Sequence, residues 1–263
     1  MTNLKLTALA VLSGLGIAGC LPASVLINVS ATSDIFLAGQ PATAGNTTPA
    51  CTTANLGCLP PVLNFLPVAG NVLTFTGPGI LTGQAVTGTV SACPACGSVG
   101  PDGSNLGSQP PATNISSSGT TISGIQYTGV EFFLMGVFTG ASLPGSQVAS
   151  IGDYGNIASG ITSTQGTYSP LVGQTFFIGD GLTGNQSGSL QQFIVPTGAT
   201  NLYLGFADAM SFVGQAGMYN DNTGSLAVNL QIMPATAAPE PGSVAMMALG
   251  LAALLIGRKK LFA

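Results

Sequence analysis

Apolar and polar residues alternate in short runs along most of the chain, which is the two-residue period of a strand with one buried face. Between residues 225 and 232, a leucine, valine or isoleucine stands at every second position, and Leu202, Leu204 and Phe206 follow the same period. Comparable runs predict strands at 24–36, 72–76, 86–91, 131–138, 175–178, 190–195, 201–207 and 225–232. No long stripe with a 3.6-residue period lies between the two ends, so the predicted fold class is all-β.

Turn-forming residues separate these runs, because the chain contains 38 glycines and 17 prolines. Once the terminal segments are set aside, residues 20–233 have the size of a single domain. About eight or nine strands with long connections predict a jelly-roll or β-sandwich ectodomain. Within it, residues 97–123 are rich in Gly, Ser, Pro, Asn and Thr, which predicts a flexible surface loop.

Positive charge is confined to the two ends of the chain, at Lys5 and at Arg258, Lys259 and Lys260. The predicted domain at 20–233 carries seven carboxylates, which are Asp34, Asp102, Glu131, Asp153, Asp180, Asp208 and Asp221. A surface with negative and no positive charge repels phosphate backbones, so nucleic-acid binding is excluded as a function. The chain has no histidine, which also removes Ser-His-Asp triads and His-based zinc sites.

The first 19 residues have the features of a secretory signal peptide, with Lys5 before an apolar stretch. Two cleavage routes remain open. Ile17-Ala18-Gly19-Cys20 resembles a lipobox, in which Cys20 is lipidated and becomes the first mature residue. Alternatively, the small residues Gly16 and Ala18 suit ordinary cleavage after Ala18.

The other end has three parts, beginning with a proline-rich linker at 234–242. Residues 243–257 are uncharged and predict a transmembrane helix of about 22 Å, short of a roughly 30 Å hydrocarbon core unless the basic residues snorkel. Residues 258–263 form a basic tail, which by the positive-inside rule lies in the cytoplasm.

The order of these features resembles a PEP-CTERM sorting tail. Pro239, Glu240 and Pro241 come first, the apolar segment follows, and Arg258-Lys259-Lys260 ends three residues from the terminus. The resemblance implies recognition by an exosortase, a membrane enzyme, and a place in the cell envelope or on the outer surface. Proteins with this tail are linked to exopolysaccharide production.

Five cysteines are present, and lipidation or removal of Cys20 leaves Cys51, Cys58, Cys93 and Cys96. An even number of cysteines in an exported chain favours two disulfides, and both local and crossed pairings are compatible with the sequence. A redox site at Cys93-x-x-Cys96 is disfavoured, because the surrounding sequence indicates a turn rather than a helix N-terminus. A zinc site is disfavoured because only one pair has ligand-like spacing.

Candidate chemistry lies at Asp208, which follows one predicted strand, and at Asp221-Asn222, which precede another. If these strands are antiparallel neighbours, the side-chain oxygens meet at one end of the sandwich, and hard oxygen ligands suit calcium. The alternative is that the run from Asn220 to Gly224 is simply a favourable turn. Asp180 has the same two interpretations, a second cation site or a hairpin turn, and the other acids are expected in turns or at solvated edges.

The stretch from 194 to 232 also resembles the C-terminal strands of the PA-IL-like family, calcium-dependent galactose-binding lectins with a jelly-roll fold. The matching features are Val-Pro-x-Gly-Ala-Thr at 195–200, the acid at 208 and Gly-Met-Tyr-Asn-Asp-Asn-Thr-Gly-Ser at 217–225. The resemblance implies calcium ligands at Asp208, Asp221, Asn222, the Met218 carbonyl and, through Gly100-Pro101-Asp102-Gly103, the Cys93 carbonyl. The lectin residues that contact galactose beside the metal have no counterpart here.

Three functions therefore compete. The first is a calcium-stabilised module that binds exopolysaccharide or a galactose-like surface glycan, and the second is a matrix protein in which calcium is only a structural staple. The third, a glycoside hydrolase with a carboxylate pair such as Asp208 and Asp221, is disfavoured because metal-bound carboxylates transfer protons poorly. The expected protein is not an enzyme.

Overall fold

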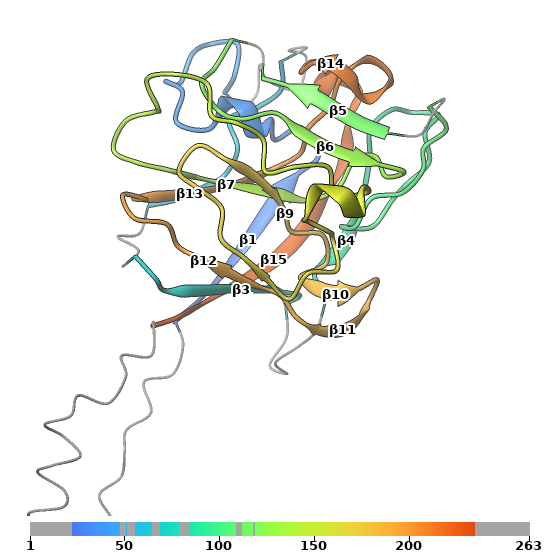
Figure 1. The fold of residues 1–263 in the computed structure, drawn as a ribbon. Coiled ribbons are helices and arrows are strands. Elements are labelled where there is room, and N and C mark those ends of the chain that lie inside the picture. The colour runs from blue at the N-terminus through green and yellow to red at the C-terminus, as the bar shows by residue number, and fades with distance from the viewer. Residues whose placement is uncertain are drawn as a thin grey trace, which may run out of the picture.

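The computed structural model describes residues 23–47, 51, 56–64, 69–78, 85–108, 112–117 and 119–234, and its fold is all-β as predicted (Figure 1). The strands are β1 (Ala23–Ser30), β2 (Val62–Leu63), β3 (Val72–Thr76), β4 (Thr87–Ser91), β5 (Ala112–Ser116), β6 (Ile125–Thr128), β7 (Met135–Thr139), β8 (Thr167–Tyr168), β9 (Thr175–Phe177), β10 (Leu182–Gly184), β11 (Ser187–Leu190), β12 (Gln192–Ile194), β13 (Asn201–Gly205), β14 (Val213–Gln215) and β15 (Thr223–Met233). Short 3-10 turns are η1 (Ile35–Leu37), η3 (Ile157–Ser159), η4 (Met210–Phe212) and η5 (Tyr219–Asp221).

Strand β15 is the centre of the larger sheet, whose order is β1-β15-β3-β12-β8. It pairs with β1 along one side, and with β4 and then β3 along the other, all antiparallel. The predicted alternation is present, because Leu226, Val228 and Leu230 are fully buried while the residues between them are partly exposed. The 11-residue strand β15 therefore buries one face along its length while it pairs with β4 near its start and with β3 near its end.

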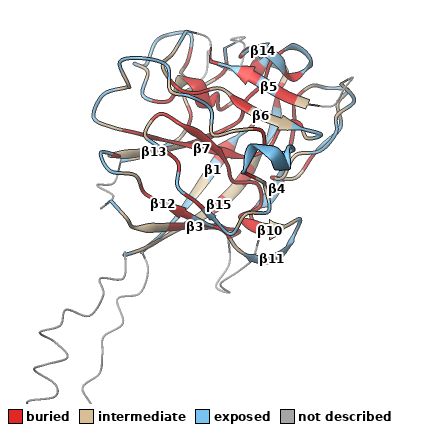
Figure 2. Cartoon of the chain, viewed as in Figure 1, coloured by how far each residue is buried: buried red, intermediate tan, exposed pale blue. Residues whose placement is uncertain are grey.

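A second sheet of order β2-β13-β7-β9 faces the first, and a smaller sheet of order β14-β5-β6 lies beside them. Aromatic side chains fill the space between the two main sheets: Phe176 of β9 packs on Phe193 of β12 with 5.3 Å between ring centroids. Phe193 also contacts Phe75 and Tyr168 at 5.0 and 5.1 Å. In Figure 2 the buried residues follow these facing strands, an arrangement consistent with the predicted sandwich.

Several predicted boundaries are wrong. The strand predicted at 131–138 begins at Met135, and the one predicted at 190–195 is interrupted at Gln191. The first predicted strand, 24–36, ends at Ser30, because Asp34 accepts a hydrogen bond from the Phe36 backbone N–H (2.8 Å) and caps the η1 turn. The predicted loop 97–123 contains β5, which buries Thr113 and Ile115 on one face and pairs with β6. Its Gly- and Ser-rich surroundings concealed this short alternating run.

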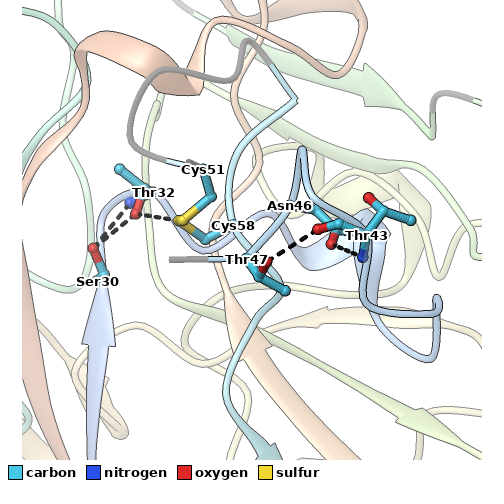
Figure 3. The surroundings of a disulfide bond; sticks show 7 residues. All are labelled: Ser30, Thr32, Thr43, Asn46, Thr47, Cys51 and Cys58. Atoms are coloured by element: carbon cyan, nitrogen blue, oxygen red, sulfur yellow. Dashed lines mark hydrogen bonds between the residues drawn. A yellow bond between two sulfur atoms is a disulfide. The ribbon is translucent and has the colours of Figure 1, made fainter. Parts of the chain in front are cut away.

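All four cysteines outside the signal region form local disulfides, Cys51–Cys58 and Cys93–Cys96. Figure 3 shows the first of them beside the segment that follows β1, where the Thr32 hydroxyl donates to Cys58 Sγ at 3.3 Å. The backbone of Cys58 also donates to the Thr32 carbonyl (2.7 Å) and accepts from the Asp34 N–H (3.0 Å). This loop is therefore held against the strand end that leads to Asp34.

The predicted signal peptide (1–19), Cys20, the linker and the transmembrane helix (243–257) with its basic tail lie outside the described residues. Across the described ranges, no helix is long and apolar enough to cross a membrane.

Candidate metal centre

Asp208, Asp221 and Asn222 come together at the end of the sandwich where β15 begins. Asp208 lies three residues beyond β13, and Asp221-Asn222 lie in and just after η5. The two segments are tied by a hydrogen bond from the Gly217 N–H to the Asp208 carbonyl (2.9 Å). A third segment also contacts the site, because Asn222 Nδ2 donates to the carbonyl of Ala31, which follows β1 (3.1 Å).

A cavity of about 300 Å³ opens at this position. Its lining includes Cys93, Ser108, Asp208, Ser211, Met218 and Asp221. Leu106, Met210 and Phe212 add apolar surface. The structure thus places Asp208, Asp221, Met218 and Cys93 around one cavity, with Asn222 beside it.

Three side-chain oxygens at this site are buried and receive no hydrogen bond from any residue in the described ranges. They are Asp208 Oδ2, Asp221 Oδ1 and Asn222 Oδ1. A buried oxygen left without a partner costs about 1–3 kcal/mol, so three of them in one place represent a substantial loss of stability. A bound cation would remove that cost, because each oxygen would become a ligand.

The two backbone carbonyls predicted as ligands differ in their surroundings. Met218 adopts a left-handed conformation (φ 72°) as it enters η5, which is uncommon for a non-glycine residue. The Cys93 carbonyl already accepts hydrogen bonds from Ser91 Oγ (2.7 Å) and from the Cys96 N–H (3.2 Å). These two hydrogen bonds make the Cys93 carbonyl a poor candidate for a metal ligand.

Asp34 and Tyr219 belong to the site, although sequence reasoning placed Asp34 in an ordinary turn. Tyr219 is fully buried, and its hydroxyl accepts from the Asp208 N–H at 3.0 Å. The same hydroxyl lies 3.0 Å from Asp34 Oδ1 and 3.1 Å from the Phe206 carbonyl, either of which takes its proton. Tyr219 therefore positions the backbone at Asp208. This role is visible only in the fold, where Tyr219 lies between Asp34 and Asp208. Along the sequence, Tyr219 is 185 residues from Asp34.

Burial perturbs both buried acids in the same direction. It is the main cause that raises the pKa of Asp208 to about 8, and the nearby carboxylate of Asp221 adds to the shift while the Asn222 side chain opposes it. Burial likewise raises the pKa of Asp34 to about 7, against the hydrogen bonds from Phe36 and Tyr219. The site is an electronegative pocket with no internal counter-charge, since residues 6–257 contain no basic side chain.

These groups fit a calcium ion better than a transition metal or magnesium. The chain has no histidine and the four described cysteines are in disulfides, so nitrogen- and thiolate-preferring ions lack ligands. Within the described ranges, no three His, Cys, Asp or Glu side chains group together, so an ion here would also need amide and carbonyl oxygens. Two carboxylates, one amide and nearby backbone carbonyls form an irregular, all-oxygen set, which calcium accepts and magnesium does not favour.

The raised pKa values give a pH dependence that can be measured. An aspartate with a pKa above its ordinary 3.8 binds its proton more tightly in the folded state, so stability falls as pH rises toward the raised pKa. After removal of metal ions, we expect Tm to fall between pH 5 and pH 8. In calcium this fall should diminish, because the ion stabilises ionised Asp208. A Tm that rises over this pH range without metal would contradict the raised pKa values of Asp34 and Asp208.

The remaining acids have structural partners. The Glu131 carboxylate is fully buried and accepts from the Leu106 N–H (2.7 Å), the Ser108 hydroxyl and the Ala112 N–H (3.3 Å), so the expectation of a solvated edge is wrong for Glu131. Asp153 accepts from the Thr128 N–H and hydroxyl, both at 2.8 Å, as an acid in a turn does.

A family model of the PEP-CTERM protein-sorting motif matches residues 237–260, as the Pro-Glu-Pro signature predicted. The motif indicates an exported, envelope-associated protein that an exosortase processes at the membrane. The matched residues, with Pro239, Glu240, Pro241 and the basic cluster, lie outside the described part of the chain. Comparison with curated proteins and with solved structures finds no match.

Proposed function

We propose that this exported protein binds calcium through Asp208, Asp221 and Asn222, and uses the site to bind neutral glycans of the cell surface or of an exopolysaccharide. The observation that carries the proposal is the set of three buried oxygens without donors, contributed by the three side chains that the sequence singled out. Calcium, when bound, would supply positive charge and coordination positions for sugar hydroxyls.

The surroundings of the site support a neutral, hydroxylated ligand. The absence of basic side chains from residues 6–257 leaves nothing to bind a phosphate, sulfate or carboxylate group. The cavity offers the Ser108 and Ser211 hydroxyl groups together with the apolar surface of Leu106, Met210 and Phe212. A sugar ring presents hydroxyl edges and C–H faces, so both kinds of surface have a use. The likeness to calcium-dependent jelly-roll lectins supports the same class of ligand.

A second candidate function is calcium as a structural staple without a sugar ligand. Asn222 is bonded to the end of β1, Asp208 follows β13, and Asp221 precedes β15. An ion held by all three would cross-link strand ends of both main sheets. In neither case do we propose an enzyme, because the chain lacks histidine and the site acids would be metal ligands.

The metal assignment is tested by calorimetric titration of the metal-free chain with calcium. We expect one site per chain and a loss of affinity of at least tenfold in Asp221→Ala. The matched control is Asn220→Ala, which truncates an exposed neighbour in the same η5 turn and should leave calcium binding unchanged. Equal affinity in wild type and Asp221→Ala would refute the proposed ligand set.

The glycan assignment is tested on a glycan array, with the chain applied in calcium and again after chelation. Binding to neutral glycans that disappears with chelator, and that Asp221→Ala lacks, supports a lectin-like function. Calcium binding without any glycan binding supports the staple. Glycan binding that persists in chelator would place the sugar site elsewhere on the protein.

A further inference from the structure

A second cavity, of about 260 Å³, shares no lining residue with the first. Its polar lining consists of Asp102, Tyr127, Ser163, Thr164, Thr183 and Asn185. Val130, Phe177 and Leu182 provide apolar surface. The residues come from five separate places, namely the turn before residue 104, the end of β6 with the residues that follow it, the segment after η3, the end of β9 and the β10–β11 hairpin.

Asp102, which lines this cavity, is hydrogen-bonded to the buried residue Asp180 behind it. Asp102 Oδ1 accepts from the Asp180 N–H at 2.8 Å. The Asp180 carboxylate in turn accepts from the Leu182 N–H (2.8 Å) and the Gln186 N–H, and the residue is fully buried. Asp180 is therefore occupied in holding the hairpin, whereas Asp102 is only partly buried and lines the cavity.

The backbone around Asp102 and Asp180 has no room for a side chain at two glycine positions. Gly179 has φ 58°, and a Cβ there would lie 2.3 Å from Asp102 Oδ1. Gly181 has φ 82°, and its Cβ would lie 2.1 Å from the Phe75 carbonyl oxygen. Glycine at both positions lets the hairpin approach Asp102 and the core strand closely. The cavity wall is thus a packed structure rather than a gap between loops.

The lining selects against ions of either sign. No basic side chain exists between residues 6 and 257, so an anion would meet only carboxylates. A metal cation would compete with three N–H groups, since Asp102 Oδ1 and the Asp180 carboxylate already accept from the backbone. This pattern differs from the first cavity, where the three oxygens have no donors. The hairpin interpretation of Asp180, rather than a second cation site, is therefore favoured.

The same lining suits hydroxyl groups. Tyr127 donates its proton to Ser163 Oγ at 2.6 Å, which leaves the Ser163 proton to be donated onward. The Tyr127 ring is held edge-on against Phe133 and Phe177, with centroids 5.4 and 5.6 Å away. Donors and acceptors on a rigid frame, next to a small apolar surface, match a molecule that carries several hydroxyl groups on a carbon ring.

We propose that this cavity is a calcium-independent binding site for a neutral polyhydroxylated molecule the size of one sugar ring, with Asp102 as hydroxyl acceptor and Ser163, Thr164 and Thr183 as further partners. Its volume is below the range of pockets for drug-sized ligands, which limits the occupant to a single ring. The site is independent of the calcium site and does not rest on the function proposed there.

Saturation-transfer NMR tests the proposal on the full chain in a zwitterionic detergent, without metal ions and with chelator present. The probes are D-glucose, D-galactose, D-mannose and L-rhamnose at millimolar concentration. We expect saturation transfer to at least one of them, unchanged in Asp221→Ala. Asn185→Trp should reduce it at least fivefold, because this exposed hairpin residue lines the cavity and a tryptophan there blocks it. Asp102→Asn, which keeps an acceptor for the Asp180 N–H, should weaken it similarly.

The matched control is Ile157→Trp, which adds the same ring at a position that is 84% exposed and does not line the cavity. This variant should bind like wild type. The proposal is overturned if none of the four sugars shows transfer, if Asn185→Trp leaves transfer intact, or if Asp221→Ala abolishes it. The proposal is also overturned if Asp221→Ala still binds calcium and adding Asp102→Asn removes that binding, because the second cavity would then be a cation site. If Asp102→Asn does not fold, the saturation transfer measured with Asn185→Trp is sufficient to test the proposal.

Discussion

Asp208→Asn is expected to change the stability of the protein in opposite directions with and without calcium. In chelator at pH 8.5, the variant should melt at a higher temperature than wild type, because burial and the neighbouring Asp221 disfavour the ionised Asp208 carboxylate. In calcium the order should reverse. At a calcium concentration 1,000 times Kd, wild type gains about 4 kcal/mol in unfolding free energy, a gain that the variant largely loses with the charged ligand.

The measurement is a pair of thermal melts for each protein, with Asn220→Ala as the exposed control from the same turn. A calcium-dependent rise in Tm of the same size in Asp208→Asn and wild type would contradict a ligand role for Asp208. Equal Tm values for Asp208→Asn and wild type in chelator would contradict only the destabilising effect of the Asp208 charge, and not the role of Asp208 as a ligand.

Phe193→Ala is expected to have the largest effect on folding itself. Phe193 is fully buried at the contact between the two main sheets, and its ring lies 5.0–5.3 Å from the rings of Phe75, Tyr168 and Phe176. Truncation removes apolar burial and leaves a cavity that rigid neighbouring rings fill poorly. We expect a loss of about 3–5 kcal/mol in unfolding free energy.

Urea unfolding with the disulfides intact measures this loss as a lower midpoint with an unchanged m-value. Leu171→Ala is the control, because Leu171 is 60% exposed and its truncation should change the unfolding free energy by no more than about 0.5 kcal/mol. A Phe193→Ala loss below about 1 kcal/mol would mean that the two sheets do not share this core.

The strands with the clearest two-residue period were predictable from sequence, and those with short or polar faces were not. Strand β3 matches its prediction, and β15 extends only slightly beyond it, because alternating apolar residues define both. Strand β5 was missed since one of its two buried residues is Thr113, whose hydroxyl donates to the Val130 carbonyl (2.9 Å). Burial of a threonine depends on a hydrogen-bond partner elsewhere in the fold, which a local pattern does not contain.

The candidate site was predictable in part for the same reason. Asp208, Asp221 and Asn222 flank well-patterned strands, but the expectation that these strands are antiparallel neighbours is wrong, because β13 and β15 belong to different sheets. The two segments meet instead across the sandwich, where the Gly217 N–H donates to the Asp208 carbonyl. Asp34 joins them only through a tyrosine 185 residues away, and its position beside a turn resembled any capping acid. Contacts of such long separation are set by tertiary packing, and a single sequence does not reveal them.

The pairing of β1 with β15 also determines how the cavity is presented at a cell surface. Ala23 lies opposite Ile232, so the first and last described strands enter and leave the fold at the same edge, whereas Ser30 and Ser225 pair at the other end, next to Asp221 and Asn222. Strand β15 has 11 residues and is about 35 Å long. Attachment through either end of the chain would therefore leave the cavity around Asp208 and Asp221 at the end of the sandwich away from the point of attachment.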